Sequence, residues 1–85
     1  MIIAVGSDEA NAMTEALLHA LVERGHTLQR FGALGDGNDE DWPLMARNVG
    51  RAVASGQAAQ GIVCCWTGTG ASIAANRVRG VRAAL

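Results

Sequence analysis

Hydrophobic residues follow two alternating patterns along this chain. Continuous apolar runs near residues 1–6, 27–31, 61–65 and 81–85 are typical of strands buried on both faces of a sheet. Between the runs, apolar residues recur three and four positions apart, a spacing that predicts amphipathic helices. Strands that alternate with helices predict an α/β fold in which helices cover both faces of a parallel sheet.

Capping and helix-breaking residues indicate where the helices begin and end. Ser7 and Asp8 can cap the first helix, and Asp41 can cap the second, which opens with a favourable proline at Pro43. The second helix is expected to bury one apolar face, formed by Leu44, Met45, Val49, Ala52 and Val53. We expect the three helices within residues 8–25, 41–56 and 70–80, with a surface loop at 32–41.

These elements predict one domain over residues 1–85, with a three-layer Rossmann-like fold whose parallel sheet stops after a fourth strand at 81–85. A buried strand with no covering helix after it leaves apolar surface open to water. A small aliphatic core is a second reason to expect that a partner stabilises the fold, because short chains bury a smaller share of their surface. We therefore expect a homodimer or a higher homo-oligomer.

Composition excludes several classes of partner. The formal net charge is −1, with 7 basic and 8 acidic residues intermingled, so we expect no binding to nucleic acid or to a membrane. The apolar run at residues 1–5 is too short for a signal or transmembrane segment, and we expect a cytoplasmic protein. Cys64 and Cys65 are adjacent and point to opposite faces of a strand, so we expect two free thiols and no metal site.

The stretch G-I-V-C-C-W-T-G-T-G-A-S-I-A-A-N-R at residues 61–77 is where we expect the chemistry. It joins a buried strand to a helix through a turn that carries glycines at 68 and 70. Backbone N–H groups from such a turn converge at the carboxyl end of the strand, and that spot favours anions. Cys65 ends the strand there, whereas Cys64 is expected to lie in the core.

Five motifs in this order resemble a known family over essentially the whole chain: the sugar-phosphate isomerases that include type B ribose-5-phosphate isomerase and the galactose-6-phosphate isomerase subunits. The longest motif is the 61–77 stretch just described. The other four are I-A-V-G-S-D-E-A at residues 3–10, D-W-P at 41–43, A-V-A-S-G-Q-A at 52–58 and G-V-R-A-A-L at 80–85. Members of this family have about 150 residues, one ordinary domain, so the resemblance implies that the chain holds the N-terminal portion.

The resemblance implies interconversion of an aldose phosphate and a ketose phosphate through an enediolate, without metal or organic cofactor. Cys65 matches the family's catalytic base, and Asp8 matches a residue that contacts substrate hydroxyls. Trp42 replaces a tyrosine that lies beside the sugar. The turn whose backbone amides stabilise the enediolate, with the serine that follows it, is matched by Thr67, Gly68, Thr69, Gly70 and Ser72.

Two positions depart from the family pattern at the expected site. Glu9 stands where the family has a histidine that contributes to the phosphate end, and a carboxylate there would repel phosphate. Trp66 stands where the family has a glycine after the catalytic cysteine, which narrows or reshapes the pocket. We count both as substrate-binding residues and expect a changed substrate.

Other interpretations of these residues remain open. Cys65 could be an inert small hydrophobe, Asp8 only a helix cap, and Trp42 only a packing residue at the start of a helix. The whole chain could be a non-catalytic relative that binds a small anion or only oligomerises. A dinucleotide-binding domain is disfavoured, because its G-x-G-x-x-G fingerprint follows the first strand and an acidic residue follows about 20 positions later.

Overall fold

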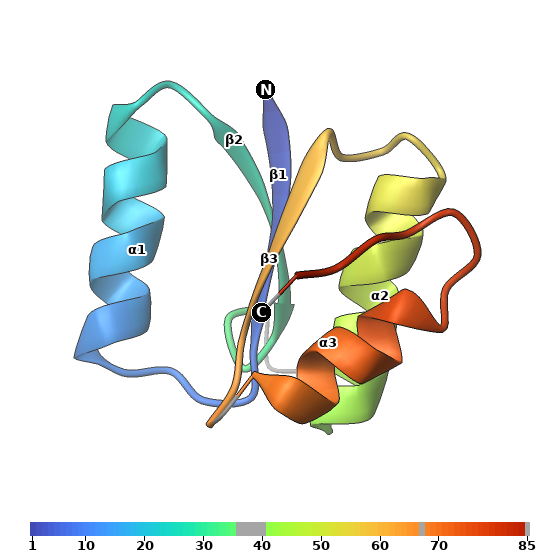
Figure 1. Ribbon diagram of the computed structural model, residues 1–85. Coiled ribbons are helices and arrows are strands. Elements are labelled where there is room, and N and C mark those ends of the chain that lie inside the picture. Colours follow the sequence, from blue (N-terminus) through green and yellow to red (C-terminus); the bar gives the residue numbers. More distant parts are fainter. Residues whose placement is uncertain (36–40, 67, 85) are drawn as a thin grey trace.

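The computed structural model has three layers, a parallel sheet between helices (Figure 1). Helix α1 covers one face of the sheet, and α2 and α3 cover the other. This arrangement confirms the predicted Rossmann-like α/β fold. The structure describes residues 1–35, 41–66 and 68–84. The elements are β1 (Ile2–Ser7), α1 (Ala12–Glu23), β2 (Thr27–Gly32), α2 (Trp42–Ala54), β3 (Gln60–Cys64) and α3 (Thr69–Asn76).

The first strand, β1, is the central strand of the sheet. The strand order is β2-β1-β3, and β1 pairs in parallel with both neighbours. The chain thus adds β2 on one side of β1 and then returns to add β3 on the other. Ser7 ends β1 opposite Gly32 of β2 and opposite Cys64 of β3. In open α/β sheets, ligands bind outside the carboxyl ends of strands at such a reversal, which here lies between β1 and β3.

The core lies between the sheet and α2 and is built from small and aliphatic residues. Gly6 of β1 faces α2, and a methyl group added there would lie 2.6 Å from Sδ of Met45. The absence of a side chain at Gly6 therefore lets α2 lie close to the sheet. Leu44 was expected on the buried face of α2 but is 41% exposed, because it lies in the first turn of the helix on the side that faces solvent. The buried residues of the main cluster are Ala4, Met45, Val49, Ala52 and Ala58.

Helix α1 begins later than expected, and its cap is Asn11. Ser7 was predicted as a cap but continues β1, because its backbone pairs with both neighbouring strands. The Asn11 side chain accepts a hydrogen bond from the Thr14 N–H, and the Thr14 hydroxyl accepts one from the Asn11 N–H. This reciprocal pair is a capping box. Asp8 lies in the loop before it and does not cap the helix.

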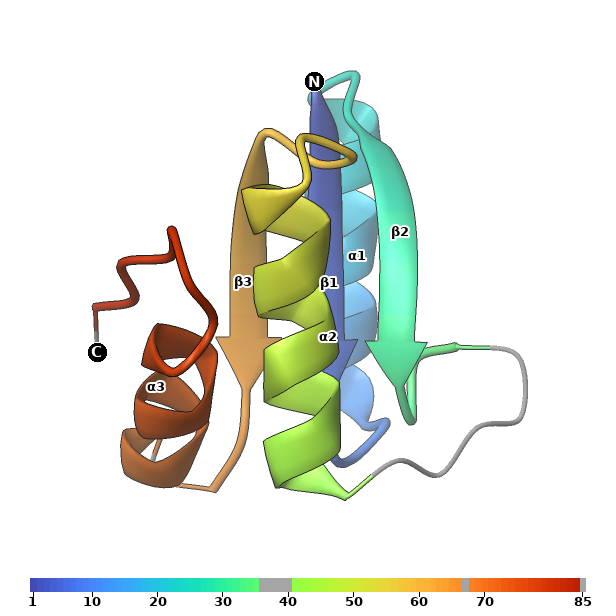
Figure 2. The ribbon, with the colours of Figure 1, turned by 90° about the vertical axis from the view of Figure 1, so that its right-hand side faces the viewer.

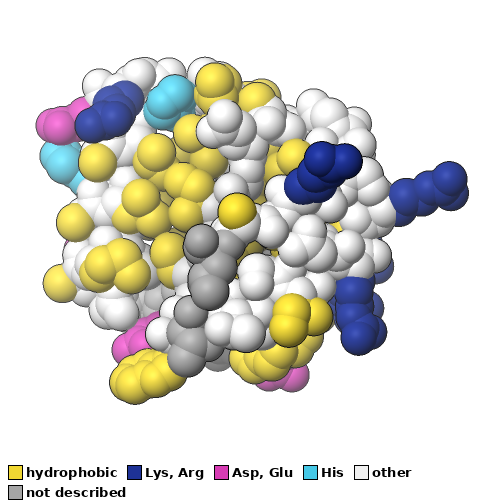
Figure 3. Space-filling view, viewed as in Figure 1, with side chains coloured by type: hydrophobic (Ala, Val, Ile, Leu, Met, Phe, Trp, Pro, Cys, Tyr) yellow, Lys and Arg dark blue, Asp and Glu magenta, His cyan; other side chains and the backbone are white. Residues whose placement is uncertain are grey.

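Helix α1 leaves apolar side chains open to solvent. Met13 is 56% exposed and Val22 is 53% exposed, although both belong to the helical apolar pattern. Figure 3 shows hydrophobic side chains gathered between α1 and the middle of the molecule, on the side of the β3 strand. In the described ranges, none of the helices is both long and apolar enough to cross a membrane.

The predicted fourth strand is not formed by residues 81–84, which have no regular structure. The segment lies on the β3 side of the sheet (Figures 1 and 2), but its backbone forms hydrogen bonds with a side chain of α3 and not with β3. The Asn76 side chain accepts a hydrogen bond from the Ala83 N–H at 2.8 Å and donates one to the Ala83 carbonyl at 3.0 Å. The amide of Asn76 thus takes the place that a neighbouring strand would have, which explains why the prediction was wrong.

Candidate active site

The ends of β1 and β3 bring two of the predicted motifs together. Ser7 pairs with Cys64, so the residues that follow each strand, Asp8 and Cys65, emerge at the same edge of the sheet. The cavity at this edge has a volume of about 200 Å³. Four of its lining residues were predicted as site residues, namely Asp8, Glu9, Cys65 and Trp66; the others are Ser7, Asn11, Met13 and Cys64.

The Cys65 thiol lies between this cavity and the helical layer. It is half-buried and packs against a cluster of small residues on α2 and α3. Its Sγ accepts a hydrogen bond from the backbone N–H of Gly68 at 2.9 Å. This hydrogen bond holds the sulfur at the end of β3, against the turn that begins α3.

Cys64 has a different environment from Cys65. It is half-buried and lines the cavity, whereas the sequence placed it in the core. Burial chiefly, with smaller contributions from the charges of Cys65 and Asp8, raises the pKa of the Cys64 thiol. A raised pKa keeps this thiol protonated at neutral pH, and a protonated thiol is a poor base and a poor nucleophile.

Ser7 fixes the loop that carries the two acidic residues. Its side chain is almost fully buried, with 2% of the residue exposed. Its hydroxyl donates to the Glu9 carbonyl at 2.7 Å and accepts from the Glu9 N–H at 3.1 Å. The Glu9 backbone is therefore held at the rim of the cavity by two hydrogen bonds, and Asp8 lies between the two bonded residues.

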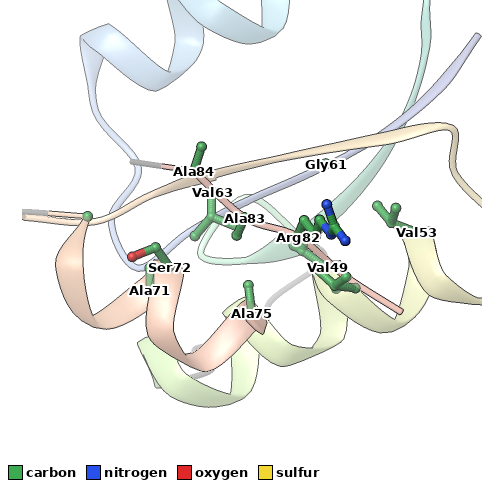
Figure 4. A pocket seen from close by; sticks show the side chains of 13 residues that line it. Val49, Val53, Gly61, Val63, Ala71, Ser72, Ala75, Arg82, Ala83 and Ala84 are labelled. Atoms are coloured by element: carbon green, nitrogen blue, oxygen red, sulfur yellow. The ribbon is translucent and has the colours of Figure 1, made fainter. Parts of the chain in front are cut away.

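Four of the remaining predicted site residues line two other cavities. Gly68 and Ser72 line a cavity of about 280 Å³ between β3, α2, α3 and the 81–84 segment (Figure 4). This is the largest of the three, but its walls are mostly apolar: Val49, Val63, Ala71 and Ala75 surround it, together with Arg82. The Ser72 hydroxyl donates to the Thr69 carbonyl at 2.8 Å, a bond within the first turn of α3.

Trp42 and Gly70 meet in a third cavity, of about 270 Å³, between α2 and α3. A methyl group added at Gly70 would lie 2.7 Å from the Trp42 ring, so the indole lies directly on the glycine. Arg47 and Arg77 also line this cavity. Thr69 is exposed and lines none of the three cavities, and Thr67 lies outside the described residues.

Sequence reasoning missed Asn11 and Met13 as lining residues of the Cys65 cavity. The signal that could have found them is the N-x-x-T spacing of Asn11 and Thr14, which is typical of a helix start. A helix that begins there places its first residues at the carboxyl edge of the sheet. Within residues 1–35, 41–66 and 68–84, no group of three or more His, Cys, Asp or Glu side chains could hold a metal ion.

Comparison with known proteins gives a consistent result. The profile of the family described as Ribose/Galactose Isomerase matches residues 3–85. Galactose-6-phosphate isomerase subunit LacB of Clostridium acetobutylicum is 35% identical over 86 residues, which cover 100% of this chain and 49% of the relative. Ribose-5-phosphate isomerase B of Escherichia coli K12 is 39% identical over 82 residues, which cover 95% of this chain and 54% of the relative.

A solved structure agrees with these relatives. Ribose-5-phosphate isomerase B of Clostridium thermocellum superimposes with a TM-score of 0.83 at 38% sequence identity. The match covers 96% of this chain and 55% of that structure's chain. The chain therefore spans about half the length of the proteins it matches.

Proposed function

The chain belongs to the ribose/galactose isomerase family, and on that premise we propose that it is an aldose–ketose isomerase acting on a phosphorylated sugar of the ribose 5-phosphate type. The observation that carries the proposal is the hydrogen bond from the Gly68 N–H to Cys65 Sγ beside the cavity that Asp8 lines. A reaction of this kind needs a base at the carbon next to the carbonyl and donors for the oxygen that becomes charged.

In the proposed mechanism, the Cys65 thiolate removes the proton from C2 of the aldose and becomes a thiol. The electron pair of the C–H bond forms the C1–C2 double bond, and the carbonyl oxygen takes the negative charge of an enediolate. The thiol then returns its proton to C1, and the proton of the C2 hydroxyl passes to the C1 oxygen, so that C1 becomes a CH₂OH group and C2 becomes the ketose carbonyl. Backbone N–H groups of the turn around Gly68 stabilise the enediolate, and Asp8 accepts hydrogen bonds from sugar hydroxyls.

The proposal extends to assembly and cofactors. We propose that the protein works as a homodimer, which the exposed apolar side chains of α1 support. Proton transfer between adjacent carbons moves no electrons to or from an external acceptor, so the proposed reaction needs no redox cofactor.

The test is an isomerase assay of the chain against pentose and hexose phosphates in D₂O, with deuterium incorporation at the sugar carbons followed by NMR. We expect Cys65→Ala to lower the exchange rate by a factor of about 10² to 10⁴, the usual contribution of a general base. Cys64→Ala, the matched control one residue earlier, is expected to keep most of the rate. Equal and mild effects of the two substitutions would contradict Cys65 as the base.

A second candidate function is a non-catalytic relative that binds a small anion or only oligomerises. The observation that favours it, in the form that only oligomerises, is that the carboxylates of Asp8 and Glu9 line the cavity beside Cys65 and would repel a phosphorylated substrate. Turnover of any sugar phosphate by the purified chain, lost in Cys65→Ala, would exclude this alternative. Absence of exchange with every sugar in the panel would favour it.

A further inference from the structure

The Trp42 cavity, which lies between α2 and α3, brings two positive charges together from different parts of the chain. Arg47 belongs to the first half of α2, and Arg77 is the C-cap residue of α3. Both line this cavity of about 270 Å³. Figure 2 shows the two helices side by side, and Figure 3 shows the basic side chains of the visible face chiefly on their side of the molecule. Two guanidinium groups at one cavity repel each other, and an anion held between them replaces this repulsion with attraction.

Trp42 gives the cavity a flat apolar wall beside these charges. A methyl group added at Gly70 would lie 2.7, 2.8 and 3.3 Å from three carbons of the six-membered ring of the indole, so the ring occupies the room that glycine leaves. The ring is thereby held against α3, yet 42% of Trp42 remains exposed. Ile73 lines the same cavity one turn after Gly70 and is 55% exposed. An indole and an aliphatic side chain exposed together are suited to contact a flat ring.

Charge and shape together match one class of ligand, a flat ring system joined to a doubly charged anion. A phosphate monoester carries a charge of about −1.5 to −2 at neutral pH, which two guanidinium groups balance. Arginine binds phosphate oxygens through two parallel hydrogen bonds, and nucleobases stack on indole rings. A sugar phosphate offers the charge without the ring, and a nucleoside offers the ring without the charge.

We propose that the Trp42 cavity binds a nucleoside monophosphate, with the phosphate between Arg47 and Arg77 and the base against Trp42 and Ile73. The cavity volume lies near the lower end of the range for ligand sites, which favours a mononucleotide over a dinucleotide. This site goes beyond the proposed isomerase activity, because none of its lining residues belongs to the Cys65 cavity.

The experiment is an NMR titration of the chain with adenosine monophosphate, adenosine and ribose 5-phosphate at matched ionic strength. Trp42 and Trp66 line different cavities, so their indole N–H signals, assigned with Trp66→Phe, report the two cavities separately. We expect adenosine monophosphate to move the Trp42 signal and to leave the Trp66 signal in place. It should bind at least about tenfold more tightly than adenosine or ribose 5-phosphate, because each of these lacks one of the two recognised groups.

Substitution of the arginines tests the phosphate contacts. Arg47→Gln and Arg77→Gln should each weaken binding of adenosine monophosphate about tenfold and change adenosine binding less than about twofold, because only the charged ligand uses the guanidinium groups. Arg51→Gln and Arg79→Gln are the matched controls. They make the same charge change one turn further along α2 and two positions after Arg77, and neither residue lines any of the three cavities. Both controls should keep the wild-type affinity within about twofold.

Four results would overturn the proposal. They are a Trp42 signal that adenosine monophosphate does not move, a ligand that moves the Trp66 signal instead, equal affinities for adenosine monophosphate and ribose 5-phosphate, and equal losses in the arginine variants and their controls. Cys65→Ala should leave binding of adenosine monophosphate unchanged. Failure of the isomerase proposal is therefore separate, because it would appear in deuterium exchange and not in this titration.

Discussion

The backbone N–H of Gly68 reaches Sγ of Cys65 across 2.9 Å from a residue whose φ is +79°. In this left-handed region a residue with a Cβ is strained by about 1 to 2 kcal/mol, whereas glycine is not. Gly68 is also the N-cap residue of α3. One glycine thus ends the turn, starts the helix and donates to the thiol.

The first prediction concerns this hydrogen bond. Gly68→Ala should lower the free energy of unfolding by about 1 to 2 kcal/mol and change the alkylation rate of Cys65, because the displaced N–H no longer donates to its sulfur. Iodoacetamide rates, measured by mass spectrometry in a Cys64→Ala background, give the reactivity of the single thiol. Gly56→Ala is the control, since Gly56 has a φ of +82° with open space around an added Cβ. It should lose similar stability with no change in alkylation; equal alkylation rates in both variants would disprove the role of Gly68.

The second prediction is a loss of stability at alkaline pH. The chain has no Lys and no Tyr, so the titration of those side chains does not overlap with that of the Cys64 thiol at alkaline pH. Burial raises the pKa of Cys64 above its ordinary value of 9.0, so the unfolded chain loses this proton first. Its contribution to the free energy of unfolding is therefore complete below pH 9 and declines as pH rises through the raised pKa.

Urea unfolding between pH 8 and 10.5 measures this decline. Cys64→Ala should make the dependence on pH shallower, because the shifted thiol is gone. Asp8→Asn should also reduce it, since the Asp8 charge is one of the causes of the raised pKa. The same slope in wild type and Cys64→Ala would show that the Cys64 thiol is not responsible.

The third prediction concerns Trp42 and Gly70. Alanine in place of a helical glycine usually stabilises a helix by about 0.5 to 1 kcal/mol. At Gly70 the added methyl group would lie 2.7 Å from the Trp42 indole, so Gly70→Ala should instead destabilise the fold by about 1 to 3 kcal/mol. In a Trp42→Ala background the sign should reverse to a gain of up to about 1 kcal/mol. Denaturant unfolding of the wild type, the two single variants and the double variant measures both, and a cost that persists without Trp42 would contradict the contact.

The fourth prediction concerns the two hydrogen bonds between the Asn76 side chain and Ala83. Asn76→Ala should release the 81–84 segment and lower the free energy of unfolding by about 1 to 2 kcal/mol. Hydrogen exchange of the Ala83 amide, followed by NMR, should lose its protection. Asn76→Asp retains an acceptor for the Ala83 N–H and should have a smaller effect. Unchanged exchange at Ala83 in Asn76→Ala would mean that other contacts hold the segment.

The three strands and the second helix could be predicted closely, because each depends on a local pattern. Continuous apolar runs predicted β1, β2 and β3 within one residue at each end, and Trp42-Pro43 marked the start of α2. The fourth strand could not be predicted correctly from its apolar run. Its absence depends on a side chain seven positions away, Asn76, which bonds the backbone of Ala83.

The candidate site was predictable to the extent that it follows from strand order. Asp8 and Cys65 each follow a parallel strand, and parallel strands end at the same edge, so their meeting required only that β1 and β3 be neighbours. The separation of Trp42 and Gly70 into another cavity was not predictable, because it depends on how α2 and α3 pack. The cap at Asn11 was missed because Ser7 and Asp8 are equally good cap residues in isolation.

Ser7 holds the backbone at the rim of the cavity through hydrogen bonds that do not depend on which side chains stand at positions 8 and 9. Its backbone pairs with β2 and β3, its carbonyl accepts the Ala33 N–H, and its hydroxyl holds the Glu9 backbone. None of these bonds uses the side chains at positions 8 and 9. Evolution can therefore exchange those two side chains, and with them the chemistry at the rim, while the backbone that presents them stays in place.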